Sequence, residues 1–130
     1  MLEVGLYAKL SGDAGVSALV GSRIYPLLMP QEPTLPAIVY QRISTVPQGQ
    51  SHQGGNHLNR ARMQLACHAE TMLAAKELAA AVWRALDGSR GTWGNVTVES
   101  CLRANELDGY EPEVEAYRVM ADYWIVYEEF

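Results

Sequence analysis

Three histidines are the residues of this 130-residue chain that first suggest chemistry, because imidazole binds metal ions and exchanges protons near neutral pH. His52 and His57 lie in a polar stretch, and His68 lies on the polar side of a predicted strand. A two-histidine metal site also needs a carboxylate or thiolate ligand, and the stretch around His52 and His57 contains neither. We therefore interpret the three as solvated side chains and predict no metal site and no cofactor.

The carboxylates cluster at Glu111, Glu113 and Glu115 and again at Glu128 and Glu129. A pair of carboxylates can perform acid–base catalysis when one of them has a raised pKa. The spacing of these residues instead favours an exposed, solvated acidic edge. The chain also lacks GxSxG, HExxH, a phosphate-binding P-loop and a GxGxxG turn after a strand. The sequence thus predicts a protein that is not an enzyme.

Two cysteines and two arginines remain as candidates for chemistry. Cys67 and Cys101 occur in unrelated segments without CxxC spacing, which favours buried thiols in a reducing compartment over a disulfide or a zinc site. Arg60 and Arg62 share one side of a predicted strand that carries no aromatic neighbour for them, so stacking on bases and an ion pair with a neighbouring subunit both stay open. A formal net charge of -5 disfavours nucleic-acid binding by the whole domain.

The elements that hold these residues begin with two short helices. Leucines at spacing four, starting at Leu2, predict a helix that ends near Ser11, and Asp13 caps a second helix that ends at Gly21. Four prolines between 26 and 36 then predict an extended loop with little strand pairing. Thr71 caps the main helix, which runs to about Asp87 and presents an apolar stripe.

The strands are predicted from alternation and from β-branched residues. They span 37–46, 60–69, 96–103 and 117–127, with a turn-rich connection at 88–94 and a turn at 105–112. In the third strand, Val96, Val98, Ser100 and Leu102 are expected to share one side. The predicted fold is α+β: an antiparallel four-stranded sheet, one main helix packed across a face, and short N-terminal helices. Residues 1–130 form a single domain in this interpretation, and no apolar run is long enough to cross a membrane.

Two features of this fold are left without a partner inside the chain. The stretch 48–59 is too polar to bury itself, and the far side of the last strand carries more apolar surface than solvent requires. We predict that both contact other proteins, with the stretch becoming ordered on assembly. The candidate interface residues are Gln48, Gln50, His52, Gln53, His57, Asn59, Arg60, Arg62, Met120, Trp124 and Val126.

Three blocks of the sequence, taken in order, resemble the tail-completion or tail-terminator family of long-tailed bacteriophages, also called tail-to-head joining proteins. The blocks are LSGDAGVSALVGSRIYP at 10–26, LPAIVYQRIS at 35–44, and ARMQLACHA leading into AAKELAAAV within 61–82. The C-terminal third is similar only as a general strand pattern.

The resemblance implies a structural virion protein located at the head–tail junction and assembled in the bacterial host cytoplasm. Copies would form a homohexameric ring on the head-proximal end of the tail tube, stop tube polymerisation and present a joining surface to the head connector or head-completion protein. Genomic DNA would pass through without specific binding, and no membrane would be involved. Glu111, Glu113 and Glu115 are candidates for an acidic lining of the channel.

Two other functions remain open. Another neck protein, such as a head-completion subunit or a stopper, would differ in its partner, because it would bind the portal of a filled head and not the tube end. A small enzyme or ligand-binding α+β domain would use His52, His57 and Arg60, and bound zinc would support that alternative.

Overall fold

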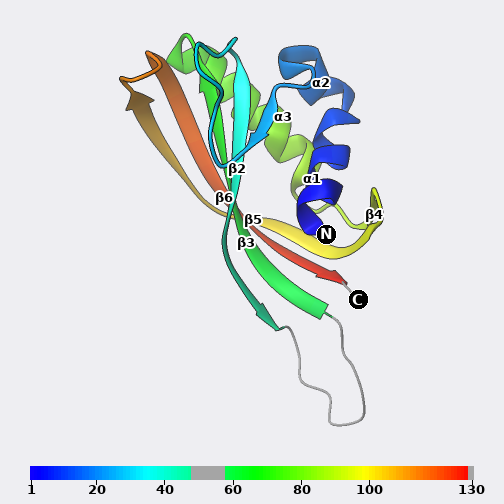
Figure 1. The fold of residues 1–130 in the computed structure, drawn as a ribbon. Helices are drawn as coiled ribbons and strands as arrows, with labels where there is room; N and C mark the ends of the chain where they lie inside the picture. The colour runs from blue at the N-terminus through cyan, green and yellow to red at the C-terminus, as the bar shows by residue number, and fades with distance from the viewer. Residues whose placement is uncertain (48–57, 129–130) are drawn as a thin grey trace, which may run out of the picture.

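The structure is a computed structural model that describes residues 1–47 and 58–128. Three helices and a six-stranded sheet make up the described chain (Figure 1). In chain order the elements are α1 (Leu2–Ser11), α2 (Ala14–Val20), β1 (Ile24–Pro26), β2 (Ala37–Pro47), β3 (Leu58–Ala69), α3 (Met72–Leu86), β4 (Gly91–Trp93), β5 (Val96–Glu111) and β6 (Ala116–Glu128).

The helices form where the caps and apolar spacing predicted them. The Asp13 carboxylate accepts a hydrogen bond from the Val16 N–H at 3.0 Å, and the Thr71 hydroxyl accepts one from the Ala74 N–H at 3.1 Å. Each cap satisfies a backbone donor that the helix itself leaves unpaired. Gly21 ends α2 with a φ of 56°, a conformation that side chains with a Cβ rarely adopt. The residues of the predicted stripe of α3 are buried: Ala75, Leu78, Ala79, Val82 and Leu86.

The sheet has the order β1-β2-β3-β6-β5-β4, so the prediction of four antiparallel strands was incomplete. The four central strands are antiparallel, but β1 pairs in parallel with β2 at one edge and β4 pairs with β5 at the other. Both additional strands have three residues, in a proline-rich and a glycine-rich segment. Strands this short leave too few residues for alternation to be recognised.

The predicted turn at 105–112 was also wrong, because β5 continues through it to Glu111. Asn105, Asp108 and Gly109 are residues typical of turns. Here they pair with Asp122, Val119 and Arg118 of β6. Pairing with the long β6 strand outweighs the local preference, as is common for β-structure.

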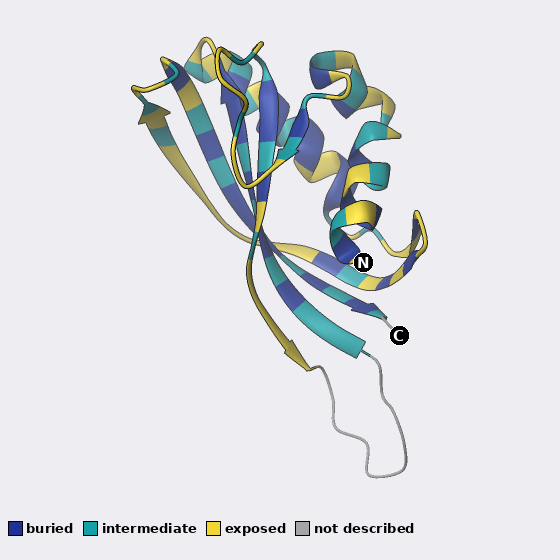
Figure 2. Ribbon diagram, viewed as in Figure 1, coloured by how far each residue is buried: buried dark blue, intermediate teal, exposed yellow. Residues whose placement is uncertain are grey.

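The helices cover one face of the sheet, and the core lies between them (Figures 1 and 2). Helix α3 packs against β3 and β6, and α1 and α2 contact α3. The alternation predicted for β3 and β6 is confirmed by burial of Ala61, Met63, Leu65 and Cys67 and of Val119, Ala121, Tyr123, Ile125 and Tyr127. Tyr117, predicted on the same side of β6, is exposed near the start of the strand. In the described residues no helix is long and apolar enough to span a membrane.

Candidate interaction surface

The sheet face opposite the helices, called the open face below, consists of alternate side chains from the four central strands. One row across it joins Ser44 to Arg62, Arg62 to Trp124 and Trp124 to Leu102. No helix of the described chain packs on this face (Figure 1). Leu102 and Leu107 expose 57% and 54% of their surface there, so the open face has an apolar component that a solvated sheet does not need.

An arginine–tryptophan cluster occupies the middle of the open face. The guanidinium carbons of Arg60 and Arg62 lie 4.2 and 5.7 Å from the centroid of the Trp124 ring. The Arg62 Nε also donates to a carboxylate oxygen of Asp122 at 2.8 Å, and Asp122 is buried. The expectation that these arginines have no aromatic neighbour was therefore wrong, because strand pairing places Trp124 of β6 beside them. The ion pair of Arg62 is formed within the chain.

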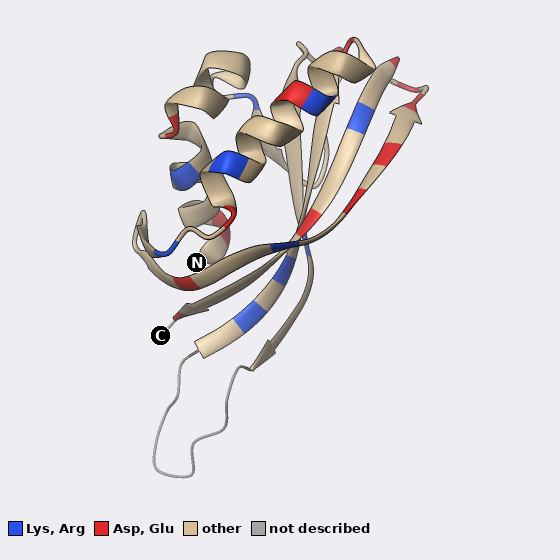
Figure 3. Cartoon of the chain, turned by 180° about the vertical axis from the view of Figure 1, so that it is seen from behind, with Lys and Arg blue, Asp and Glu red and all other residues tan. Residues whose placement is uncertain are grey.

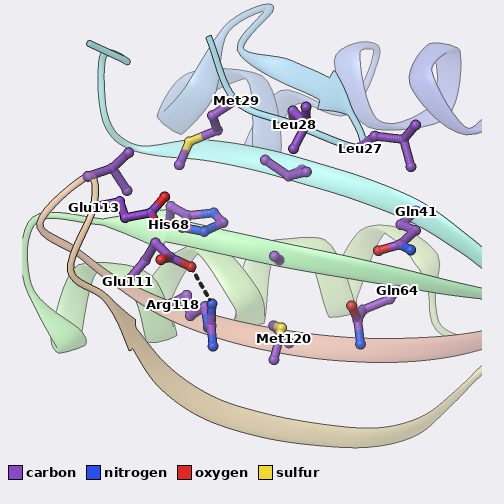
Figure 4. Close-up of a pocket in the computed structure, with 13 residues that line it drawn as sticks. Leu27, Leu28, Met29, Gln41, Gln64, His68, Glu111, Glu113, Arg118 and Met120 are labelled. Atoms are coloured by element: carbon purple, nitrogen blue, oxygen red, sulfur yellow. Dashed lines mark hydrogen bonds and ion pairs between the residues drawn. The ribbon is translucent and has the colours of Figure 1, made fainter. Parts of the chain in front are cut away.

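A groove of about 310 Å³ lies at one end of the open face (Figure 4). The proline-rich segment at Leu27–Met29 forms one of its sides, and Arg118 and Glu111 line another part, joined by a hydrogen bond of 2.7 Å from Arg118 Nη1. His68 lies in this groove and is only 6% exposed. Burial lowers the pKa of the His68 imidazole. The prediction that His68 is solvated was wrong, because residues distant in sequence cover it.

A comparison with family models extends this description beyond geometry. The model for the family described as Tail completion protein gp17 matches residues 4–128. The chain belongs to this tail completion family. The resemblance inferred from three sequence blocks is thereby confirmed, and the match includes the C-terminal third that those blocks did not reach.

A solved structure shares the fold of this tail completion family member. It is a chain from the virion of a native gene transfer agent particle, with a TM-score of 0.71 and 19% sequence identity. The likeness covers 95% of this chain and 92% of that chain. A comparison with curated proteins found no match.

In this tail completion family member, the structure brings together five of the candidate interface residues. Arg60, Arg62, Met120, Trp124 and Val126 all lie on the open face. Asn59 is paired with Tyr127, whose side chain is buried on the helix side, and so belongs to the opposite face. The remaining candidates, Gln48, Gln50, His52, Gln53 and His57, lie outside the described residues.

Sequence reasoning missed Leu102 and Leu107 as members of the open face. Leu102 was grouped with Val96 and Val98, which are buried, but an irregularity between Val98 and Ser100 shifts the alternation by one residue. As a result Cys101 is buried and Leu102 is exposed. Leu107 was assigned to the predicted turn. The signal available in the sequence was that the predicted strand 117–127 is longer than the predicted strand 96–103.

The two thiols belong to the core and not to the open face. Cys67 and Cys101 are free and buried, as predicted. Burial raises the pKa of each thiol to about 12. Thiolate is the reactive form of cysteine, so neither residue is a nucleophile near neutral pH. Within the described ranges, no group of three histidine, cysteine or acidic residues is placed to hold a metal ion.

Proposed function

We propose that this protein is a structural component of the virion tail that forms a ring on the head-proximal end of the tail tube. The ring ends tube polymerisation and provides the surface to which the head connector binds. The observation that carries this proposal is membership of the tail completion family over residues 4–128. The fold shared with a chain of a gene transfer agent virion is consistent with a particle component.

The open face supports an assembly role on physical grounds. It combines exposed Leu102 and Leu107 with the Arg60–Trp124 stack, and arginine and tryptophan are the residue types that most often dominate binding energy at protein interfaces. In a ring each contact is repeated around the axis, so modest contacts together give a stable assembly. No catalytic step is part of this role. The net charge of -5 would let DNA pass without specific binding.

Electron microscopy of the purified protein, alone and mixed with tail tubes, tests the proposal. We expect rings of six copies and caps at tube ends. Leu102→Glu places a charge on the open face and should reduce the fraction of capped ends at least tenfold. Leu73→Glu is the matched control, because Leu73 is 71% exposed on α3, on the helix side. Equal capping by the two variants would remove the open face from the proposal.

The same preparation separates the proposed function from that of another neck protein. A terminator binds tube ends, whereas a head-completion subunit or stopper binds the portal of a filled head. Sedimentation with tubes and, separately, with filled heads that lack tails measures this difference. Binding to heads alone would replace the terminator with the head-completion alternative.

A further inference from the structure

Strand β2 has an outer edge that is only half covered. Strand β1 pairs with β2 from Ile38 to Tyr40, and the Leu27 N–H donates to the Tyr40 carbonyl at 2.9 Å. Beyond Tyr40, no strand of the described chain pairs with that side of β2, although the strand continues to Pro47. The segment 41–47 is called the free edge of β2 below. It presents backbone donors and acceptors that another strand could pair with.

The opposite edge of the sheet is also half covered, but at the other end. Strand β4 pairs with β5 only from Val96 to Val98. The Cys101 carbonyl then accepts from the Gly88 N–H at 2.8 Å, and the Arg103 N–H donates to the Asp87 carboxylate at 2.9 Å. Past Arg103, no described strand pairs with the outer side of β5, which runs on to Glu111. The segment 104–111 is called the free edge of β5.

Beyond Arg42, the free edge of β2 lacks the charges found on edges that remain in solvent, and the free edge of β5 combines charges with exposed apolar side chains. Monomeric proteins protect free edges with charges, above all lysine, and with prolines. After Arg42 the free edge of β2 has no charged residue until its end at Pro47 (Figure 3), and Ile43 and Val46 are 46% and 42% exposed. The free edge of β5 carries the carboxylates Glu106, Asp108 and Glu111. It also exposes Leu107 and Tyr110. The apolar side chains that both edges expose are expected to be covered in the working assembly.

We propose that the free edge of β2 in one copy pairs with the free edge of β5 in the next copy, so that the sheet continues from subunit to subunit. The central order is β2-β3-β6-β5, and each neighbouring pair is antiparallel. The strand directions therefore alternate across the sheet. If the next copy has the same orientation, its β2 runs antiparallel to β5 of the first copy. This head-to-tail contact covers both free edges of every copy inside the assembly. A different partner protein bound to one edge would leave the other edge uncovered.

The positions of the free edges also set the stagger between neighbouring copies, and that stagger is compatible with a closed ring. Ser44 lies in the middle of the free edge of β2, and the row of paired residues that starts at Ser44 ends on β5 at Leu102. The middle of the free edge of β5 lies farther along that strand, near Leu107. Leu102 pairs with Trp124 and Leu107 with Met120, four positions apart on β6, because a bulge adds one residue to β5. Neighbouring copies must then shift by about four residue pairs, or about 14 Å, along the strands. Over four strands spaced about 4.8 Å apart, this shift corresponds to a tilt of about 35°. Tilts of about 35 to 45° are those of closed barrels.

Cysteine cross-linking tests the contact, which rests on the proposed ring because it specifies how the copies join. Ser44 and Leu107 both lie on the open face, so their Cβ atoms are adjacent if the strands pair there. A disulfide requires Cα atoms within about 7 Å. We expect Ser44→Cys/Leu107→Cys, or the neighbouring register Ser44→Cys/Asn105→Cys, to form a ladder of covalent oligomers on mild oxidation. The native thiols are buried and should not contribute.

Matched variants make the result decisive. Ser44→Cys/Leu102→Cys is the control, because Leu102 is exposed on the same face of β5 but lies beside the backbone covered by Asp87 and Gly88. It should give less than a tenth of the ladder. The single variants Ser44→Cys and Leu107→Cys should each stay uncross-linked alone and form a dimer when mixed. A dimer of Ser44→Cys alone would indicate a two-fold contact and overturn the proposal.

Light scattering on the same samples separates this inference from the proposed function. Rings without the ladder would overturn edge pairing and leave the ring intact. Protein that remains monomeric, with or without tail tubes, would overturn the ring and edge pairing together. A ladder in the Leu102 control equal to that of the Leu107 variant would also refute the proposed register.

Discussion

Tyr123 and Tyr127 form a matched pair for testing how buried hydroxyl groups contribute to stability. Both are fully buried on the helix side of β6. The Tyr127 hydroxyl accepts a hydrogen bond from Arg42 Nη1 at 3.0 Å. The Tyr123 hydroxyl has no hydrogen-bond partner among the described residues, and burial raises its pKa. The same substitution, Tyr to Phe, should therefore have opposite effects at the two positions.

The magnitudes follow from the cost of burying a polar group. An unsatisfied buried hydroxyl costs about 1 to 3 kcal/mol, so Tyr123→Phe should raise the free energy of unfolding by about 1 kcal/mol after the small loss of packing. Tyr127→Phe removes a hydrogen bond from a charged donor and should lower it by about 1.5 kcal/mol. Arg42 keeps its hydrogen bonds to Glu3 at 2.8 and 3.0 Å, which limits the second loss.

Urea unfolding followed by circular dichroism measures both effects. All variants must be compared at one low protein concentration, because assembly would add to the apparent stability. Equal slopes of free energy against urea would show that the folded and unfolded states are unchanged in compactness. If Tyr123→Phe lowered stability by 1 kcal/mol or more, the reasoning would be refuted, since the hydroxyl would then have to be hydrogen-bonded.

Three further substitutions test the packing, a helix cap and a buried histidine. Gly5→Ala places a Cβ about 2.7 Å from the Trp93 carbonyl oxygen, so it should lower the melting temperature and cost about 2 kcal/mol. Thr71→Ala removes the cap of α3 and should cost about 1 kcal/mol in urea unfolding. The folded-state pKa of His68 is lowered, so the unfolded chain binds the proton first and stability falls as pH drops below about 6.5. His68→Gln should flatten this fall by at most about 1.4 kcal/mol per pH unit, and an unchanged slope would contradict it.

The predictions from sequence were right where the signal is local. Asp13 and Thr71 marked the starts of α2 and α3, because an N-cap acts within its own turn. Alternation identified the buried side of β3 and β6, because the side-chain period of a strand is two wherever the pleat is regular. Five of the candidate interface residues reached a common face for the same reason.

The errors fall where residues distant in sequence meet. The break in alternation after Val98 exposes Leu102, and no local pattern announces it. His68 lies on the polar side of its strand in sequence, but it is buried in a groove that it lines together with Leu27–Met29, Glu111 and Arg118. The turn-forming residues between Asn105 and Gly109 form a strand, because the partner strand β6 compensates for their low propensity.

The amino-acid sequence alone determined the helices, the presence of the four central strands, the buried sides of β3 and β6 and the family, since caps, periodicity and ordered sequence blocks are properties of neighbouring residues. It did not determine the length of β5. Tertiary structure decided the sheet order, the position of Trp124 beside two arginines, and the lengths of β2 and β5 left unpaired by β1 and β4. These features depend on strand register, which is set by contacts between segments far apart in the chain. The edges proposed to join neighbouring copies became visible only once that register was known.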